Sequence, residues 1–421
     1  MGYLRFDKTL MTNLEESLPR EILRTNRSGA YHCSTIIDCN TRKYHGLLVI
    51  PIPEMDDENH VLLSTLDETV IQHGAEFNLG LHKYGWNNFS PNGHKYIREF
   101  DCEVISKTTY RVGGVILTKE RMLVSFEPRV LIRYTLVEAH SPTTLRLKPY
   151  LAFRSVHDLA KENTNANSDM REVENGRANR MYGAYPELFM QCSKKVEYTH
   201  APAWYKDIQY YKEEERGFSY MEDQLVPGWF EMPMKKGESV IFSAGISEVN
   251  TKTLKTLWKK ELDRREARHD MFTCLKNAAS QFYKREGDKC YLLAGYPWFK
   301  CRARDMFISL PGLTLAVEEI EKFEQVMKTA GATDANVRRW LEEEHEIEVS
   351  RSTFSRFKKK YHLTDEEKDP RARDKESLTN RAITQGQIID NEVHTDNIDL
   401  AIDTILQQQV TDIKTGLNNL D

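Results

Sequence analysis

Short apolar runs separated by turn residues recur through the first 250 residues, and this pattern restricts the fold more than any other feature. The clearest runs are GLLVI, HVLLSTLDETVI, GGVILTKERMLVSF, RVLIRYTLV, TLRLKPYLAF and ESVIFSAGI. Several of them alternate apolar and polar residues, as half-buried antiparallel strands do. Because little helical sequence separates them, residues 1–250 are predicted to form packed antiparallel sheets. The polar, Asn-rich segment 162–180 is predicted to be an exposed loop or an irregular excursion.

Residues 251–330 have a helical pattern instead. Residues 251–285 are rich in Lys, Glu, Arg and Leu, and their apolar spacing predicts one broken helix or two consecutive helices. Pro311 is tolerated in the first turn of a helix, so a further helix is expected to begin near residues 304–310. Its apolar face would comprise Leu313, Ala316, Ile320, Phe323 and Met327.

The remaining sequence changes character at Gly331. It is highly charged and contains no Cys or Met. Residues 331–364 are predicted to form two short helices around a turn, and residues 365–421 a charged linker followed by an amphipathic helix. The sequence therefore predicts an α+β multidomain protein with segments 1–250, 251–330, 331–364 and 365–421.

Overall composition excludes several classes of protein. The formal net charge is −5, which implies no general affinity for nucleic acid or acidic membranes. The seven cysteines are scattered without CxxC spacing, and the N-terminus has no apolar signal core. We therefore expect a cytoplasmic protein with no metal, no cofactor and no membrane association.

The stretch AGYPWFKCRARDMFISLPGL, residues 294–313, is the strongest candidate site. It places Tyr296 and Trp298 shortly before Arg304 and Asp305. Aromatic rings beside fixed hydrogen-bonding groups suit a sugar, whose faces are apolar and whose edges are hydroxyls. The alternative is a well-packed start of a helix, with Asp305 as its N-cap and Arg304 as the partner of Asp305.

A second candidate lies in NTRKYHGLL, where Arg42 and His45 precede a strand. Both side chains could donate hydrogen bonds to hydroxyls or to a carboxylate at the end of a sheet. The alternative is that Arg42 pairs with a buried acid and that His45 is a structural histidine. Taken alone, the residues favour this alternative.

Several stretches together resemble a known family. An Asn-x-x-Gly turn at Asn26 is followed by NTRKYHGLLV, LLSTLDETV, LKPYLAFRSVHD, YYKEEERGFSYMEDQLVPGWFEM and the aromatic stretch above. In this order, over residues 20–313, they resemble bacterial and archaeal glycogen debranching enzymes of the amylo-α-1,6-glucosidase type. The resemblance implies a β-supersandwich followed by the first helices of a glucoamylase-like (α/α)6 toroid.

The resemblance also implies a substrate, an α-glucan such as glycogen or a limit dextrin with α-1,6-linked glucose. Arg304 and Asp305 would hold the hydroxyls of the terminal glucose, while Trp298 and Tyr296 would form an apolar platform. The family usually has Gly where this chain has Ala303, and Arg302 has no counterpart.

Hydrolysis needs two carboxyl groups, about 6.5–9.5 Å apart in an inverting enzyme. In the family both lie on later helical hairpins, whereas this chain changes character at Gly331. Glu222 and Asp223 are adjacent, so in a strand they point to opposite faces. No catalytic residue is therefore assigned, enzymatic activity is left undecided, and the chain is expected to be a truncated front end.

The tail resembles the helix-turn-helix of transposases and phage DNA-packaging proteins, through WLEEEHEIEVSRSTFSRFKKKY. Residues 352–361 would form the recognition helix, and the exposed candidates for DNA contact are Arg351, Ser355, Arg356, Lys358 and Lys359. A charged helical hairpin without DNA binding, and a chimera or frameshift, are the alternatives. The last amphipathic helix would most simply mediate self-association into a homo-oligomer.

Overall fold

The computed structural model describes residues 3–56, 58–85 and 88–329. The chain divides into two compact units, residues 1–277 and residues 278–421. The predicted helix-turn-helix, its DNA-contact residues and the last amphipathic helix lie outside the described residues. No helix in the described ranges has the length and apolar content needed to cross a bilayer.

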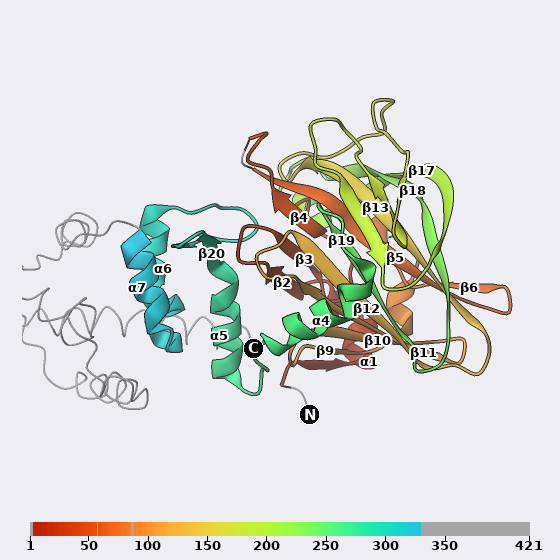
Figure 1. The fold of residues 1–421 in the computed structure, drawn as a ribbon, viewed down its shortest axis with the longest axis horizontal. Coiled ribbons are helices and arrows are strands. Elements are labelled where there is room, and N and C mark those ends of the chain that lie inside the picture. Colours follow the sequence, from red (N-terminus) through yellow and green to blue (C-terminus); the bar gives the residue numbers. More distant parts are fainter. Residues whose placement is uncertain (1–2, 57, 86–87, 330–421) are drawn as a thin grey trace, which may run out of the picture. The chain divides into compact units, whose positions relative to one another are not determined.

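Two large antiparallel sheets build the first unit (Figure 1). One is nine-stranded within the described residues, in the order β1 (Arg5–Asp7), β9 (Ile97–Asp101), β10 (Ser106–Val112), β11 (Val115–Leu123), β12 (Arg129–Glu138), β19 (Ser239–Gly245), β16 (Leu188–Cys192), β15 (Gly176–Asn179) and β14 (Arg171–Val173).

The other sheet is ten-stranded, and its strands come from the remaining apolar runs and the segments that connect them. Its order is β2 (Glu21–Thr25), β3 (Tyr31–Thr35), β4 (Gly46–Pro51), β5 (Asn59–Gln72), β13 (Thr143–Ser155), β18 (Met221–Met234), β17 (Glu197–Gln209), β7 (His82–Tyr84) and β8 (Asn88–Ser90), with β6 (Ala75–Asn78) paired to β5. The prediction of antiparallel sheets over this part of the chain is confirmed.

Apolar side chains from both sheets form one core cluster. On β10, for example, residues alternate between buried and more exposed along the whole strand, as the two-residue period of a strand requires. Phe230 on β18 and Phe242 on β19 meet across the two sheets, with ring centroids 6.2 Å apart. Burial of these inward faces supplies the main driving force for the first unit.

Segment 162–180 is only partly the exposed loop or irregular excursion that was predicted. Residues 162–170 contain no helix or strand and none of them is buried, but residues 171–179 contain β14 and β15. Asn179 explains the difference. Its side chain is buried, and its amide donates to the backbone oxygens of Asn167 at 3.0 Å and Asp169 at 2.8 Å. An asparagine-rich sequence can thus supply its own hydrogen bonds and still join a sheet.

The helices of the first unit are short. They are α1 (Lys8–Thr12), α2 (Leu14–Ser17), η1 (Gly93–Tyr96), α3 (Tyr211–Glu214), η2 (Thr251–Thr253), α4 (Leu254–Asp263) and α5 (Met271–Ala279), which continues to the first residues of the second unit. Residues 251–285 therefore form two helices rather than one. Leu254 and Trp258 of α4 pack with Leu131 and Ile241 of the nine-stranded sheet, so α4 belongs to the first unit.

The described part of the second unit is small. It contains η3 (Ser280–Phe282), β20 (Tyr283–Glu286), β21 (Lys289–Leu292), α6 (Ala303–Leu313), η4 (Leu315–Val317) and α7 (Ile320–Thr329). The predicted helix after residue 313 is broken, with Glu318 in a left-handed conformation. Pro311 lies in the last turn of α6 and not in its first. Since proline has no N–H to donate, the helix ends two residues later.

A cluster of charged side chains joins the two sheets. The Nζ atom of Lys119 on β11 lies 2.7 Å from Glu68 Oε1 on β5 and 2.9 Å from Asp38 Oδ2 in the loop after β3. Arg121 also binds Asp38, at 2.8 Å. Burial raises the pKa of Glu68. Burial would also raise the pKa of Asp38, but Arg121 and Lys119 hold it below its usual value. Two cations and two acidic groups thus offset one another inside the protein.

Replacing Lys119 should destabilise the first unit strongly. Lys119→Met removes the ammonium group and leaves Asp38 and Glu68 without their shared partner, which costs about 3–5 kcal/mol for a buried pair. Urea denaturation measures the loss. Lys107→Met, on the neighbouring strand β10 with an exposed side chain, is the control and should change stability by less than about 0.5 kcal/mol. Equal stability of the two variants would contradict the structural role of the cluster.

Candidate functional site

The aromatic loop leads from β21 into α6. Trp298 is 38% exposed and Phe299 is 48% exposed, whereas Tyr296 is only 7% exposed. The guanidinium of Arg302 lies over the Phe299 ring, 4.3 Å from its centroid, which gives this otherwise unexplained arginine a partner. The exposed rings are therefore Trp298 and Phe299, and a role for Tyr296 as a platform stays a prediction.

Asp305 lies in the first turn of α6, and Arg302 occupies the N-cap position. Asp305 is thus not the N-cap that the alternative interpretation required. A carboxylate in the first turn is favoured by the partial positive charge of a helix N-terminus. Arg304 is also in this turn, but its side chain lies outside the described part. Sugar binding by the two residues stays a prediction.

Arg42 and His45 both face Glu21 on β2. The Arg42 Nε atom lies 2.7 Å from Glu21 Oε1, and His45 Nε2 lies 3.5 Å from the same oxygen. Burial works to raise the pKa of Glu21, but the contacts with His45 and Arg42 lower it to about 2. Arg42 thus has an acidic partner, as the structural alternative expected, although Glu21 is partly exposed and not the buried acid of that alternative. Substrate contact by either residue stays a prediction.

Glu21, Cys33 and His45 also bring three potential metal-ligand atoms within 4.8 Å of one another. These three potential ligands are not in the chemical form that a metal ion requires. The backbone N–H of Thr41 donates to His45 Nδ1 at 3.2 Å, so the proton of the neutral ring is on Nε2, the nitrogen that faces Glu21. Burial raises the pKa of the Cys33 thiol, and Arg42 already neutralises the carboxylate.

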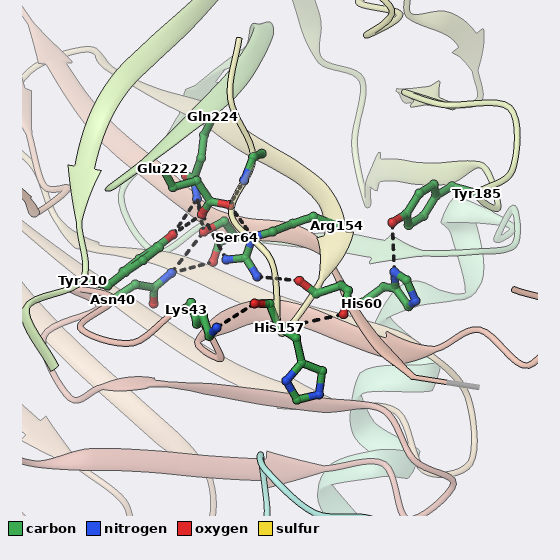
Figure 2. Close-up of polar contacts among 12 residues, drawn as sticks. Asn40, Lys43, His60, Ser64, Arg154, His157, Tyr185, Tyr210, Glu222 and Gln224 are labelled. Atoms are coloured by element: carbon green, nitrogen blue, oxygen red, sulfur yellow. Dashed lines mark hydrogen bonds and ion pairs between the residues drawn. The ribbon is translucent and has the colours of Figure 1, made fainter. Parts of the chain in front are cut away.

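Four of the stretches that carry the family resemblance converge on one buried polar network in the first unit (Figure 2). Arg154 from LKPYLAFRSVHD forms an ion pair with Glu222 from the MEDQLV stretch. The Gln224 amide donates to Glu222 at 2.9 Å and to Ser64 Oγ of LLSTLDETV at 2.7 Å. Asn40, at the start of NTRKYHGLLV, donates to the same Ser64 oxygen at 3.1 Å. Segments far apart in the sequence are thereby fixed to one another.

This network supports a group of side chains nearer the surface. Lys43 Nζ donates to the backbone oxygen of His157 at 2.6 Å (Figure 2). The Tyr44 and His157 rings meet edge to face with centroids 5.7 Å apart. His157 is about half exposed. The loop after Asn40 and the loop after Arg154 are therefore held together at their exposed ends.

Glu222 and Asp223 have separate partners, as adjacent strand residues should. Burial would raise the pKa of Glu222, but the Arg154 guanidinium holds it below its usual value. Asp223 instead accepts backbone N–H groups from Glu162 and Asp207, each at 3.0 Å. The two carboxylates therefore do not form one site.

Two known family models match the sequence of this chain. Residues 20–241 match the sequence model described as glycogen debranching enzyme N terminal. The chain belongs to this family. Residues 276–335 match a second model, described as amylo-alpha-1,6-glucosidase. No curated protein matches the chain.

Two solved structures that resemble the chain are distant in sequence. A bacterial glucoamylase crystallised with acarbose has a TM-score of 0.34 and 9% identity, covering 75% of this chain and 51% of its own. A polysaccharide lyase has a TM-score of 0.22 and 12% identity, covering 57% of this chain and 34% of its own. The chain thus spans about half the length of that glucoamylase, and family membership rests on the sequence match.

Several residues of this debranching-family chain were missed by sequence reasoning. Tyr210, whose hydroxyl donates to Glu222, is the first residue of the YYKEEERGFSYMEDQLVPGWFEM stretch, but it was not singled out there. Lys119 and Arg121 could have been found, since alternation places them on the same face of their strand as the apolar Leu117 and Leu123. A charge at such a position signals a buried partner.

Removing Arg154 should destabilise this debranching-family domain. Arg154→Met leaves Glu222 charged and buried without its cation, which costs about 3–5 kcal/mol. Arg171→Met is the matched control, because Arg171 also binds a carboxylate with two nitrogens but is about half exposed. Its loss should cost about 0–1 kcal/mol. Chemical denaturation measures the free energy of unfolding of both variants. An equal loss in Arg154→Met and Arg171→Met would contradict the role of the buried Arg154–Glu222 ion pair.

Acid should weaken the fold through Glu21. Its folded-state pKa of about 2 is lower than the unfolded value, so its stabilisation is present above pH ~4.3 and is lost as pH falls toward 2. Because Glu21 is partly exposed, we expect only about 1 kcal/mol. Denaturation curves of wild type and Glu21→Gln should therefore converge between about pH 5 and 2. Glu197→Gln, at an exposed carboxylate, is the control; a constant difference between wild type and Glu21→Gln would contradict the prediction.

Proposed function

We propose that this protein binds α-glucan through the aromatic loop in front of α6. Membership in the debranching-enzyme family supports a glucan as the ligand, and the loop lies in the part that matches the amylo-α-1,6-glucosidase model. Recognition of α-1,6-linked glucose and a cytoplasmic site of action are parts of the same proposal.

The observation that carries it is the exposure of Trp298 and Phe299 a few residues before Asp305. An exposed indole offers a flat apolar face to a sugar ring, and an aspartate in the first turn of a helix can accept hydrogen bonds from sugar hydroxyls. Both features lie within the second unit.

Hydrolysis requires more than binding, because the general acid must have a raised pKa and must reach the substrate. Glu222 fails the first condition, since Arg154 lowers its pKa despite burial. Glu68 has a raised pKa but is 2% exposed and contacts Lys119. Among the described residues we therefore assign binding and no acid or base.

Trp298→Ala should weaken glucan binding by roughly three- to tenfold, because it removes one stacking surface. Retardation in native gels containing glycogen or limit dextrin measures the affinity. Phe218→Ala is the control, since Phe218 is 52% exposed but lies in the first unit, and it should bind as wild type does.

Glucose release from limit dextrin, measured on the same preparations, separates binding from hydrolysis. Retention of full affinity by Trp298→Ala, or equal loss in Phe218→Ala, would refute the proposed site. Glucose release by the wild type would show that a general acid and base exist beyond those considered above.

A further inference from the structure

A small cavity lies inside the first unit beside the charged cluster that joins the sheets. Its volume is about 20 Å³, and its lining includes His32, Asn40, Ser64, Glu68, Lys119 and Arg121. About 10–15 Å³ of such volume is enough for one water molecule. The cavity is therefore of the size for one or two waters and far too small for a sugar ring.

Three lining side chains carry a buried polar atom without a hydrogen-bond partner among the described residues: His32 Nε2, Thr65 Oγ1 and Arg121 Nε. All three side chains are more than nine-tenths buried. The cost of burying such an atom unpaired is about 1–3 kcal/mol, so a partner is expected at each.

The His32 Nε2 and Arg121 Nε atoms have complementary hydrogen-bonding chemistry, and the Thr65 hydroxyl can both donate and accept. His32 Nδ1 lies 2.9 Å from the backbone oxygen of Gly46, and a carbonyl oxygen can only accept, so Nδ1 carries the proton. Burial, together with the nearby Arg121, holds the pKa of His32 well below its usual value. The ring is thus neutral, and Nε2 is a hydrogen-bond acceptor. Arg121 Nε is a donor, while its NH1 group is already bound to Asp38 at 2.8 Å.

We propose that this cavity is an internal hydration site, in which one or two water molecules donate to His32 Nε2 and accept from Arg121 Nε–H. Water is the ligand that can do both and that fits the volume. An ion is disfavoured, because Lys119 and Arg121 repel a cation while Asp38 and Glu68 repel an anion.

The bound water would extend the buried network of the family motifs. Asn40 and Ser64 line the cavity and also belong to the network that reaches Gln224 and Glu222. Hydration of the cavity thus connects this network to the charged cluster around Lys119, and the two form one continuous polar region inside the first unit.

A crystal structure of the full chain at high resolution is the direct test. We expect electron density within hydrogen-bonding distance, about 2.7–3.2 Å, of both His32 Nε2 and Arg121 Nε. A cavity without density would overturn the proposal.

Magnetic relaxation dispersion of water oxygen-17 gives an independent readout in solution, because it counts long-lived internal waters. His32→Phe removes the acceptor and should lower that count by one or two relative to wild type. His60→Phe is the matched control, because His60 is equally buried and both its ring nitrogens are bound, to Tyr185 and Asp56, each at 2.9 Å. An unchanged count in His32→Phe, or the same loss in His60→Phe, would refute the hydration site.

Discussion

The ammonium group of Lys119 lies between Asp38 and Glu68, and this buried ion pair is the interaction on which the packing of the first unit most depends. It joins the nine-stranded sheet to the ten-stranded sheet at a point where an apolar contact would otherwise be expected. Charges removed from water must be paired and hydrogen-bonded, so the positions of β5, β11 and the loop after β3 are fixed relative to one another. The core packs around this pairing.

Four of the family motifs contribute side chains to the same buried network. Asn40, Ser64, Arg154 and Glu222 come from segments well separated in the chain, yet they form one hydrogen-bonded network (Figure 2). Their task in this domain is to fix the loops that carry Lys43, Tyr44 and His157. The proposed glucan contact belongs instead to the second unit, where Trp298 and Asp305 depend on the start of α6.

Much of the fold could be predicted from local patterns. The apolar runs that became β4, β5, β11 and β12 identified antiparallel strands, because a run of strand-forming residues between turns is a local property of the sequence. The break between α6 and α7 and the strands within 162–180 could not be predicted in this way. Within 162–180, β15 is joined to the segment before β14 by the buried Asn179 amide, which donates to residues ten and twelve positions earlier.

The sequence by itself determined the class of the sheets, the debranching family and the residues worth testing, since each of these follows from local order and residue type. Only the tertiary structure decided which residues are partners. Glu21 binds Arg42, Glu222 binds Arg154 and Tyr296 is buried while Trp298 is exposed. The physical reason is that burial and ion pairing depend on contacts between distant strands, which no short stretch of sequence specifies.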